Sequence, residues 1–458
     1  MASAAGTSEA AVPKDLSRAG EQAETAFMRA VLRRVPAVSG ARLSDEGTET
    51  PALVFDADAV EHNCARLREV MTPFEGAVSA RPHVKSHKCP ALARRQLELS
   101  GGTCKGICAQ KVCEAEAMAA GGVRDILLSN QVVSAPKLAR LAALAASGCA
   151  VSVLVDDADQ VRFASAAASS AHTTLGVLVE VDVGQRRCGV ATVPEAVALA
   201  KLATAMPGLE FRGVQCYHGA AQHIRDYEAR KAAIDGVAGI ARACVAQLTA
   251  AGLPCATVTG GGSGTFEFEA ASGAFTEVQP GSSVVWDRDY SDNLGPDGKR
   301  VGETGFRHAL QVLATVISRT TALPNPRVVL DCGLKCMSGE SGLPALLRVL
   351  SGKSEAASGA AAASTTQPPL KVVGLSDEHT QIELDLDDPR VVAAVAASGG
   401  GADAVAAVAD EMLPKVRDRV LLAPGHCDPT CNLHDFALWA RGDVVEEVME
   451  ISARSPGL

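Results

Sequence analysis

Short apolar runs alternate with longer stretches of helical length along the chain from Pro51 to Pro280. Short apolar runs are typical of buried strands, and the longer stretches are rich in Ala, Leu, Glu and Arg. The alternation repeats about eight times, with ~25–40 residues per unit, which favours a (β/α)8 barrel over a doubly wound sheet. The expected strands are Ala52–Phe55, Val78–Val84, Gly106–Ala109, Ile126–Leu128, Ala150–Val155, Leu178–Val183, Gly213–Tyr217 and Ala256–Thr259.

The pattern changes after Pro280, because strand-like runs dominate from Val284 onward. This predicts an α/β chain in two parts, a barrel over residues 51–283 and a second, mainly β domain over 284–458. Two Ala/Gly/Ser-rich inserts, 351–369 and 391–408, are expected to be flexible loops rather than core. Residues 1–25 are expected to be a disordered extension, and residues 26–50 a lead-in that can belong to the β domain.

Composition narrows the class of protein. Apolar residues make up 47% of the 458 residues, which allows a large core, and the formal net charge is −10. An acidic chain without a basic stripe is a poor nucleic-acid binder, and the apolar runs are too short for a bilayer, so neither is an expected partner. The fourteen cysteines are expected to be buried apolar residues of a reducing compartment. The cytoplasm is the expected location, with organelle targeting left open.

The segment from Arg81 to Pro90 concentrates cations at the end of an expected strand. Barrel enzymes keep their catalytic groups at the C-terminal ends of strands. A lysine close to other cations has a lowered pKa, which makes its amine a nucleophile able to form a Schiff base with an aldehyde. A solvated basic turn is the alternative. The candidate is Lys85, and its expected cationic neighbours are Arg81, His83, His87 and Lys88.

Two glycine-bearing segments follow the last expected barrel strands. Thr259–Thr265 reads Thr-Gly-Gly-Gly-Ser-Gly-Thr, and Gln279–Ser282 reads Gln-Pro-Gly-Ser. Glycines let backbone amides approach an anion, and barrels often bind phosphate after their last strands. The first segment matches neither the Walker A nor the Rossmann pattern, so its position alone predicts a phosphate site, with a flexible connection as the alternative.

Polar residues also end two of the middle strands. Asp182–Gly189 places two arginines at a strand end, which suggests that they bind an anion or a polar ring. Surface ion pairs are the alternative. His218 and His223 follow the next strand beside Tyr217, and histidine is the usual acid–base residue near neutral pH. Both histidines are therefore candidate bases, although a single histidine is more often structural.

The predicted β domain contains a candidate metal site at His426-Cys427-Asp428. If this segment is extended, residues 426 and 428 face the same way and can share one ion, while Cys427 points away. Imidazole plus carboxylate suits Mn²⁺, Mg²⁺ or Zn²⁺, and the carboxylate favours the harder ions. An isolated turn is the alternative.

Taken in order, these segments resemble the fold-type III pyridoxal-phosphate enzymes, and more narrowly the group that holds D-threonine aldolase and eukaryotic-type D-serine dehydratase. The resemblance runs from about Thr50 to the C-terminus. It implies an alanine-racemase-type barrel, a β domain and a homodimer with the active site near the interface. It rests on Arg81–Lys88, Asp182–Gly189, Val214–Gly219, Thr259–Thr265 and Gln279–Ser282.

The resemblance also implies roles for single residues. Lys85 would carry pyridoxal 5'-phosphate as a Schiff base, Arg187 would lie near the pyridine nitrogen, and Tyr217 would contact the cofactor. Within the group, dehydratases carry His-x-Cys for zinc and aldolases carry His-x-Asp, so His426 and Asp428 resemble the aldolase pair. The cofactor phosphate would be held by Gly262, Ser263, Gly264, Thr265 and Gly281.

The expected activity is a retro-aldol cleavage of D-threonine and related D-β-hydroxy-α-amino acids to glycine and an aldehyde. It would need pyridoxal phosphate and a divalent metal, with Mn²⁺ favoured. His223 is the expected base for the β-hydroxyl, and His218 is the alternative. The main rival is a dehydratase acting on D-serine or D-3-hydroxyaspartate. An amino-acid racemase and a non-catalytic cofactor carrier are further alternatives.

Overall fold

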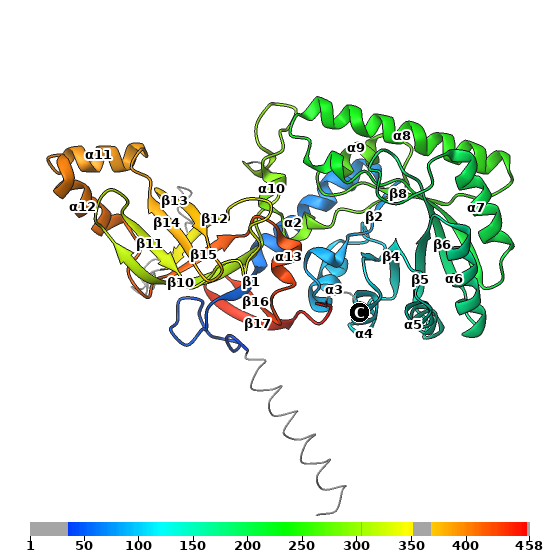
Figure 1. The fold of residues 1–458 in the computed structure, drawn as a ribbon, viewed down its shortest axis with the longest axis horizontal. Coiled ribbons are helices and arrows are strands. Elements are labelled where there is room, and N and C mark those ends of the chain that lie inside the picture. Colours follow the sequence, from blue (N-terminus) through cyan, green and yellow to red (C-terminus); the bar gives the residue numbers. More distant parts are fainter. Residues whose placement is uncertain (1–34, 304, 351–367, 456–458) are drawn as a thin grey trace, which may run out of the picture.

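Two bodies stand side by side in the computed structural model, which describes residues 35–303, 305–350 and 368–455 (Figure 1). One is a barrel of parallel strands surrounded by helices, and the other is built on a nine-stranded mixed sheet. The extension expected to be disordered, residues 1–25, lies outside the described residues, as does most of the 351–369 insert.

Eight parallel strands form the barrel, in the order β2-β9-β8-β7-β6-β5-β4-β3. The two edge strands, β2 and β3, close the barrel through Ala80 at the end of β2. Its N–H donates to the carbonyl of Thr103 (2.9 Å), and its carbonyl accepts from the N–H of Lys105 (3.0 Å), just before β3. The predicted (β/α)8 barrel is confirmed. Its strands are β2 (Ser79–Ala80), β3 (Ile107–Ala109), β4 (Asp125–Gln131), β5 (Ala150–Val155), β6 (Leu175–Glu180), β7 (Leu209–Gln215), β8 (Thr257–Gly260) and β9 (Glu277–Val278).

The barrel helices begin at capping residues that the sequence places just before each one. Thr192 accepts from the N–H of Glu195 (3.4 Å), whose carboxylate accepts from the N–H of Thr192 (2.9 Å), and Asp226 accepts from Ala229 (2.8 Å). These hydrogen bonds satisfy free N–H groups in the first helical turn and so define where each helix begins. The helices are α2 (Ala57–Met71), α3 (Pro90–Leu99), α4 (Val112–Ala120), α5 (Ala135–Ala146), α6 (Ala158–Ser170), α7 (Val193–Ala205), α8 (Tyr227–Ala250) and α9 (Phe266–Ala271).

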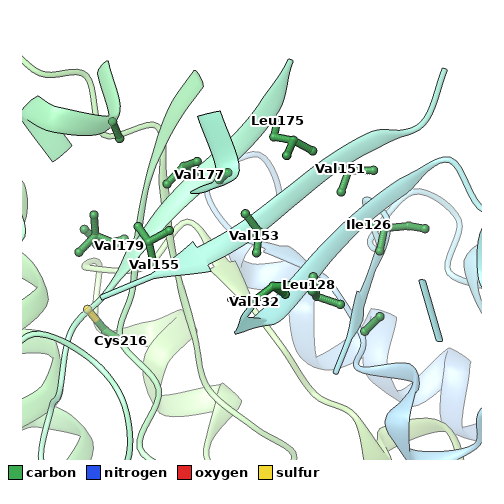
Figure 2. Packing of buried hydrophobic residues seen from close by; sticks show 14 of the residues in the cluster. Ile126, Leu128, Val132, Val151, Val153, Val155, Leu175, Val177, Val179 and Cys216 are labelled. Atoms are coloured by element: carbon green, nitrogen blue, oxygen red, sulfur yellow. The ribbon is translucent and has the colours of Figure 1, made fainter. Parts of the chain in front are cut away.

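Branched apolar side chains fill the space between the barrel strands and these helices (Figure 2). Nearly every residue of β5 and β6 is buried, as expected for parallel strands that are covered on both faces. Burying a valine or leucine contributes ~1.5–3 kcal/mol each. This core therefore holds the strand ends, and the loops that follow them, in fixed positions.

The second sheet has the order β13-β14-β11-β10-β1-β16-β17, with β12 and β15 attached through β10. The prediction of a second, mainly β region is confirmed, but one strand was misassigned. The Ala52–Phe55 run forms β1 in this sheet, antiparallel to β10 and parallel to β16, and is no part of the barrel. The strands are β1 (Ala52–Asp56), β10 (Leu310–Thr320), β11 (Arg327–Leu330), β12 (Ala345–Leu350), β13 (Leu370–Leu375), β14 (Thr380–Leu384), β15 (Arg419–Ala423), β16 (Phe436–Arg441) and β17 (Val444–Glu450).

The insert at 391–408, expected to be a flexible loop, instead forms two helices, α11 (Pro389–Ala397) and α12 (Gly401–Met412). Asp388 caps the first helix by accepting from the N–H of Arg390 (2.9 Å). Alanine has the highest helix propensity, and Val391 and Val408 are buried in the core of the second body. The prediction was wrong because alanine-rich composition is compatible with a packed helix as well as with a loop.

All fourteen cysteines are free, and most of them are buried, as the sequence predicted. Within the described residues, none of the helices combines the length and the apolar character needed to cross a bilayer.

A substitution at Gly213 in β7 tests the barrel directly. Its φ is +148°, and a Cβ there would lie 1.8 Å from the carbonyl oxygen of Thr257 in β8. We expect Gly213→Ala to lower the free energy of unfolding by at least ~3 kcal/mol through overpacking and backbone strain. Gly236→Ala in helix α8 is the control, because a Cβ at this position would meet nothing within 4 Å. This substitution should raise the free energy of unfolding by up to ~1 kcal/mol. Equal urea-unfolding curves for the two variants would contradict this packing.

Candidate active site

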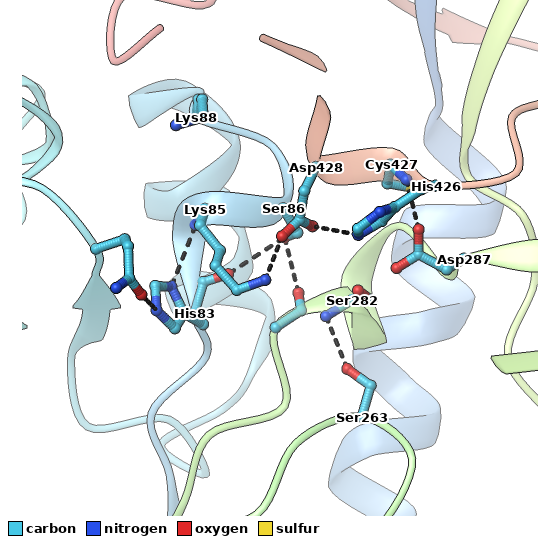
Figure 3. Close-up of polar contacts among 12 residues, drawn as sticks. His83, Lys85, Ser86, Lys88, Ser263, Ser282, Asp287, His426, Cys427 and Asp428 are labelled. Carbon is cyan, nitrogen blue, oxygen red and sulfur yellow. Dashed lines mark hydrogen bonds and ion pairs between the residues drawn. The ribbon is translucent and has the colours of Figure 1, made fainter. Parts of the chain in front are cut away.

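Four segments meet where the C-terminal ends of the barrel strands face the second sheet (Figure 3). The short turn η2 (Val84–Ser86) follows β2, a glycine loop follows β8, and the turn η4 (Ser282–Val284) follows β9. Ser86 donates from Oγ to the Gly281 carbonyl (2.8 Å), and the N–H of Ser282 donates to Oγ of Ser263 (2.8 Å). The fourth segment is the helix α13 (Cys427–Cys431) of the second body. The fold thus brings together segments far apart in the sequence.

Lys85 lies at the centre of this meeting point. Its Nζ forms an ion pair with Oδ2 of Asp428, the first-turn carboxylate of α13. Burial favours the neutral amine and would lower the pKa of Lys85, but Asp428 outweighs burial and raises that pKa above its ordinary value. The sequence-based expectation of a lowered pKa is therefore wrong for this structure.

That expectation failed because the basic groups near Lys85 in sequence are paired or neutral in space. Arg81 donates to Glu277 (2.8 Å), and Lys88 is in contact with Glu114. Both pairs are largely buried, so their charges cancel locally.

The two histidines of the segment are also uncharged. Burial lowers the pKa of both His83 and His87 to about 3. His83 shares hydrogen bonds with Ser129 (2.9 Å) and Gln110 (3.2 Å), which fix its ring at the ends of neighbouring strands. These histidines position the lysine segment.

The glycine loop lies directly on Gln222, a residue that the sequence analysis did not select. A Cβ at Gly262 would be 2.6 Å from Oε1 of Gln222, and one at Gly264 would be 2.4 Å from its carbonyl oxygen. The N–H of Gly264 donates to Oε1 of Gln222 (3.0 Å), and that of Thr265 to the Gly262 carbonyl (3.1 Å). These two amides therefore maintain the loop and are not open to an anion.

Other amides of the candidate phosphate site remain open. Within the described part of the chain, the N–H groups of Gly262, Ser263 and Gly281 have no acceptor. Gly281 also lies close to the lysine segment, because its Cβ position is 3.1 Å from Cβ of His83. A loop that admits no side chain and presents free amides has the features of a phosphate cradle.

Arg187 and Tyr217 lie together, with the guanidinium 5.8 Å from the centre of the phenol ring. Burial raises the pKa of Tyr217, and the charges of Lys85 and Arg187 oppose that rise. The three residues therefore share one electrostatic neighbourhood. The carboxyl of Glu180 lies nearby, and burial raises its pKa while Arg187 opposes the rise.

Three side chains form a candidate metal site. Asp287, His426 and Asp428 each offer a ligand atom, and these atoms lie within 4.8 Å of one another. Nε2 of His426 is 3.9 Å from Oδ1 of Asp428. Asp287, which follows the Gln-Pro-Gly-Ser segment, was not predicted, because nothing in its local sequence connects it to residue 426. Its Oδ1 accepts from the N–H of Cys427 and so ties it to α13.

The donor set fits a divalent cation. Oδ1 of Asp428 and Oδ2 of Asp287 are buried and have no hydrogen-bond partner among the described residues, and a buried carboxylate oxygen needs one. His426 directly precedes α13 and Asp428 lies in its first turn, so the expectation of an extended segment was wrong, although the two side chains do meet. Burial and the neighbouring Asp287 raise the pKa of the Cys427 thiol well above its usual range.

The two candidate bases occupy different environments. His218 lies against the loop at Gly184 and accepts at Nδ1 from the N–H of Ala221 (3.4 Å). His223 ends the turn η3 (Ala220–His223), its side chain is 55% exposed, and its ring stacks on Tyr290 with centroids 5.7 Å apart. Of the two, His223 is the more exposed.

The buried carboxyl of Glu269 in α9 is hydrogen-bonded to the last residue of the glycine loop, Thr265. Thr265 donates from Oγ1 to Oε1 of Glu269 (2.8 Å) and accepts from Nε2 of Gln222 (2.8 Å). Glu269 is completely buried, and burial raises its pKa to about 7. No sequence motif marks this residue, because its position depends on the packing of α9.

Comparison with known families agrees with this architecture. Residues 55–289 match the family described as "Alanine racemase, N-terminal domain", and residues 309–440 match the "Putative serine dehydratase domain". This chain belongs to the alanine-racemase-like family of pyridoxal-phosphate enzymes, in the group that holds D-threonine aldolase. The predicted resemblance is confirmed.

Similar proteins of this family align over most of the chain. A 3-hydroxy-D-aspartate aldolase of Paracoccus denitrificans (strain Pd 1222) is 37% identical over 92% of this chain and 96% of its own length. A D-threonine aldolase of Arthrobacter sp is 39% identical over 89% and 93%. The crystal structure of D-threonine aldolase from Filomicrobium marinum has a TM-score of 0.76 at 35% identity, covering 92% and 99%. A D-threo-3-hydroxyaspartate dehydratase of Delftia sp. (strain HT23) is more distant, at 31% over 64% and 74%.

Because Glu269 is buried, the free energy of unfolding is expected to depend on pH. Its folded-state pKa, about 7, lies above the ordinary value of 4.5, so the folded protein holds the proton more tightly. Glu269 therefore makes its full contribution to the free energy of unfolding below pH 4.5. This contribution, on the order of 3 kcal/mol, is lost as the pH rises through 7. Glu269→Gln should remove most of this loss.

The measurement is urea unfolding at pH 5.5 and at pH 8. Glu228→Gln, at an exposed carboxyl on α8, is the control and should keep the wild-type pH dependence. A Glu269→Gln protein with the wild-type pH dependence would show that Glu269 stays ionised in the fold.

Proposed function

We propose that this chain catalyses the retro-aldol cleavage of D-threonine and related D-β-hydroxy-α-amino acids to glycine and an aldehyde. The position of Asp428 supports this most strongly, since one of its oxygens faces Lys85 and the other faces His426. A carbon–carbon lyase of this kind needs an amine that binds an aldehyde cofactor next to an ion that binds a hydroxyl. The names of the similar aldolases agree with the proposal.

Pyridoxal phosphate, when bound, supplies an electron sink for the bond that breaks. Lys85 would hold its aldehyde, and the lysine must leave Asp428 to do so. The ring would lie against Tyr217, with Arg187 toward its nitrogen. The residues with free amides that would hold the phosphate are Gly262, Ser263 and Gly281, while Gly264 and Thr265 keep the loop in shape through their bonds within the protein.

His426 and Asp428, joined by Asp287, would hold a divalent cation. Two carboxylates and one imidazole favour Mn²⁺ or Mg²⁺ over Zn²⁺. The ion, when bound, would acidify a substrate hydroxyl. His223 would take the proton of that hydroxyl, because its exposed ring can approach a substrate. We also expect a homodimer.

The dehydratase alternative would use the same barrel but expel the hydroxyl. It is the weaker candidate, since the carboxylate of Asp428 suits a hard ion that exchanges its ligands, whereas a thiolate ligand would favour tightly held zinc. A racemase would require no metal site.

Substrate tests distinguish these activities. With Mn²⁺, the purified protein should convert D-threonine to glycine and acetaldehyde, and D-3-hydroxyaspartate to glycine and glyoxylate, and should leave L-threonine unchanged. Exhaustive chelation should abolish both reactions but retain the visible absorbance of the bound cofactor. Faster release of pyruvate from D-serine than of glycine from D-threonine would favour the dehydratase.

Substitution of two neighbouring lysines tests the cofactor-binding group. Lys85→Ala should abolish turnover and the visible absorbance of the lysine-bound cofactor. Lys88→Ala should keep that absorbance and lose stability instead, because it leaves the buried carboxylate of Glu114 unpaired. The opposite pattern in absorption spectra would mean that Lys88 is the cofactor-binding lysine.

A further inference from the structure

His223 has a carboxylate partner that no sequence motif indicates. Its Nδ1 lies 2.6 Å from Oδ2 of Asp289, in the short helix α10 (Arg288–Ser291). The side chain of Asp289 is only 15% exposed, whereas that of His223 is 55% exposed. The buried end of the pair is therefore the carboxylate, and the imidazole extends from it toward the open side.

Asp289 is itself held from two directions. Nη2 of Arg225 contacts its Oδ1, and Nη1 of the same guanidinium donates to its carbonyl oxygen (2.7 Å). Nη1 also donates to Oδ1 of Asn293 (2.8 Å), whose Nδ2 donates to the carbonyl of Gln222 (3.0 Å). Gln222 directly precedes His223 in the sequence. The same hydrogen-bond network therefore holds Asp289 and the backbone beside His223.

The carboxylate of Asp289 is paired with a permanent cation. Arg225 forms an ion pair with its Oδ1, which favours the ionised carboxylate, while Nδ1 of His223 lies against its Oδ2. An ionised carboxylate only accepts hydrogen bonds, so Nδ1 of His223 must carry the proton between them. In the neutral imidazole, Nε2 is then the atom with a free lone pair.

We propose that Asp289 is a positioning residue for catalysis: it fixes His223 in the Nδ1–H tautomer, so that Nε2 takes the β-hydroxyl proton, and Arg225 holds Asp289 in place. This rests on the proposed aldolase function and on His223 as its base. The proton moves from the substrate oxygen to Nε2, and the resulting imidazolium is stabilised by the Asp289 carboxylate. A pair of this kind acts through orientation and charge, and Asp289 need not touch the substrate.

The location of Asp289 also relates the base to the candidate metal site. Asp287, the residue before α10, belongs to the metal cluster, and Asp289 lies in the first turn of the same helix. One short segment therefore carries both a carboxylate for the metal and a carboxylate for the base, which fixes their separation.

The test uses Asp289→Asn in the holoenzyme. The amide keeps the size of the carboxylate but can donate to Nδ1, so His223 should switch to the Nε2–H tautomer. We expect kcat for D-threonine to fall by ~10²–10⁴, the usual effect of a general base, with KM roughly unchanged. Mn²⁺ affinity, measured by calorimetry, should stay at the wild-type value. Asp289→Glu should restore the Nδ1–H tautomer and part of kcat.

The tautomer can be read directly from ¹⁵N shifts of histidine-labelled protein, with His223→Asn used to assign the resonance. Asp292→Asn is the matched control, because this nearby carboxylate pairs with Arg300 (3.2 Å) and not with His223. Either an unchanged tautomer or an unchanged kcat in Asp289→Asn, or an equal loss in Asp292→Asn, would overturn the inference. Because the tautomer is read without substrate, failure of the wild type to cleave D-threonine would reject the proposed function alone.

Discussion

The ion pair between Lys85 and Asp428 is the contact on which the candidate site depends. Its partners are 343 positions apart in the sequence, one on the barrel and one on the second body. They meet because β1, the first described strand, lies in the second sheet, α2 leads from it to the barrel, and the chain returns to this sheet at β10 beside β1. β1 also pairs with β16, so the second sheet brings the segments before and after the barrel together. This topology fixes the position of α13 relative to the lysine.

Much of the fold could be predicted from the spacing of apolar runs, because parallel strands buried on both faces leave a strong signal. The errors have physical causes. Ala52–Phe55 has the same apolar character as a barrel strand, and only its partners β10 and β16 show that it belongs elsewhere. The eighth barrel strand, β9, has two residues, too few for any periodicity. The count of eight was right although one strand was exchanged for another.

The candidate site could be predicted only as far as local motifs reach. The glycine segments and the His-x-Asp spacing are short-range patterns, so they were visible. Gln222 and Asp287 were not, since each acts through a partner on another element. Glu269 was not visible either, because its importance comes from its complete burial, although its partner Thr265 is only four residues away. The pKa of Lys85 was misjudged because a sequence shows which cations are adjacent, whereas Glu277, which neutralises Arg81, is 196 positions away.

The site also divides its chemistry between structural units in a way that explains how related enzymes can differ. The barrel provides the lysine and the free amides. The candidate metal ligands come from α13 and from the start of α10, two short helices outside the barrel. A change from carboxylate to thiolate at residue 428 would alter the ion and the pairing of Lys85, but would leave the free amides of the glycine loop in place. We therefore expect the choice between carbon–carbon cleavage and loss of a hydroxyl to be determined in these helices, where side chains can change while the strand ends stay fixed.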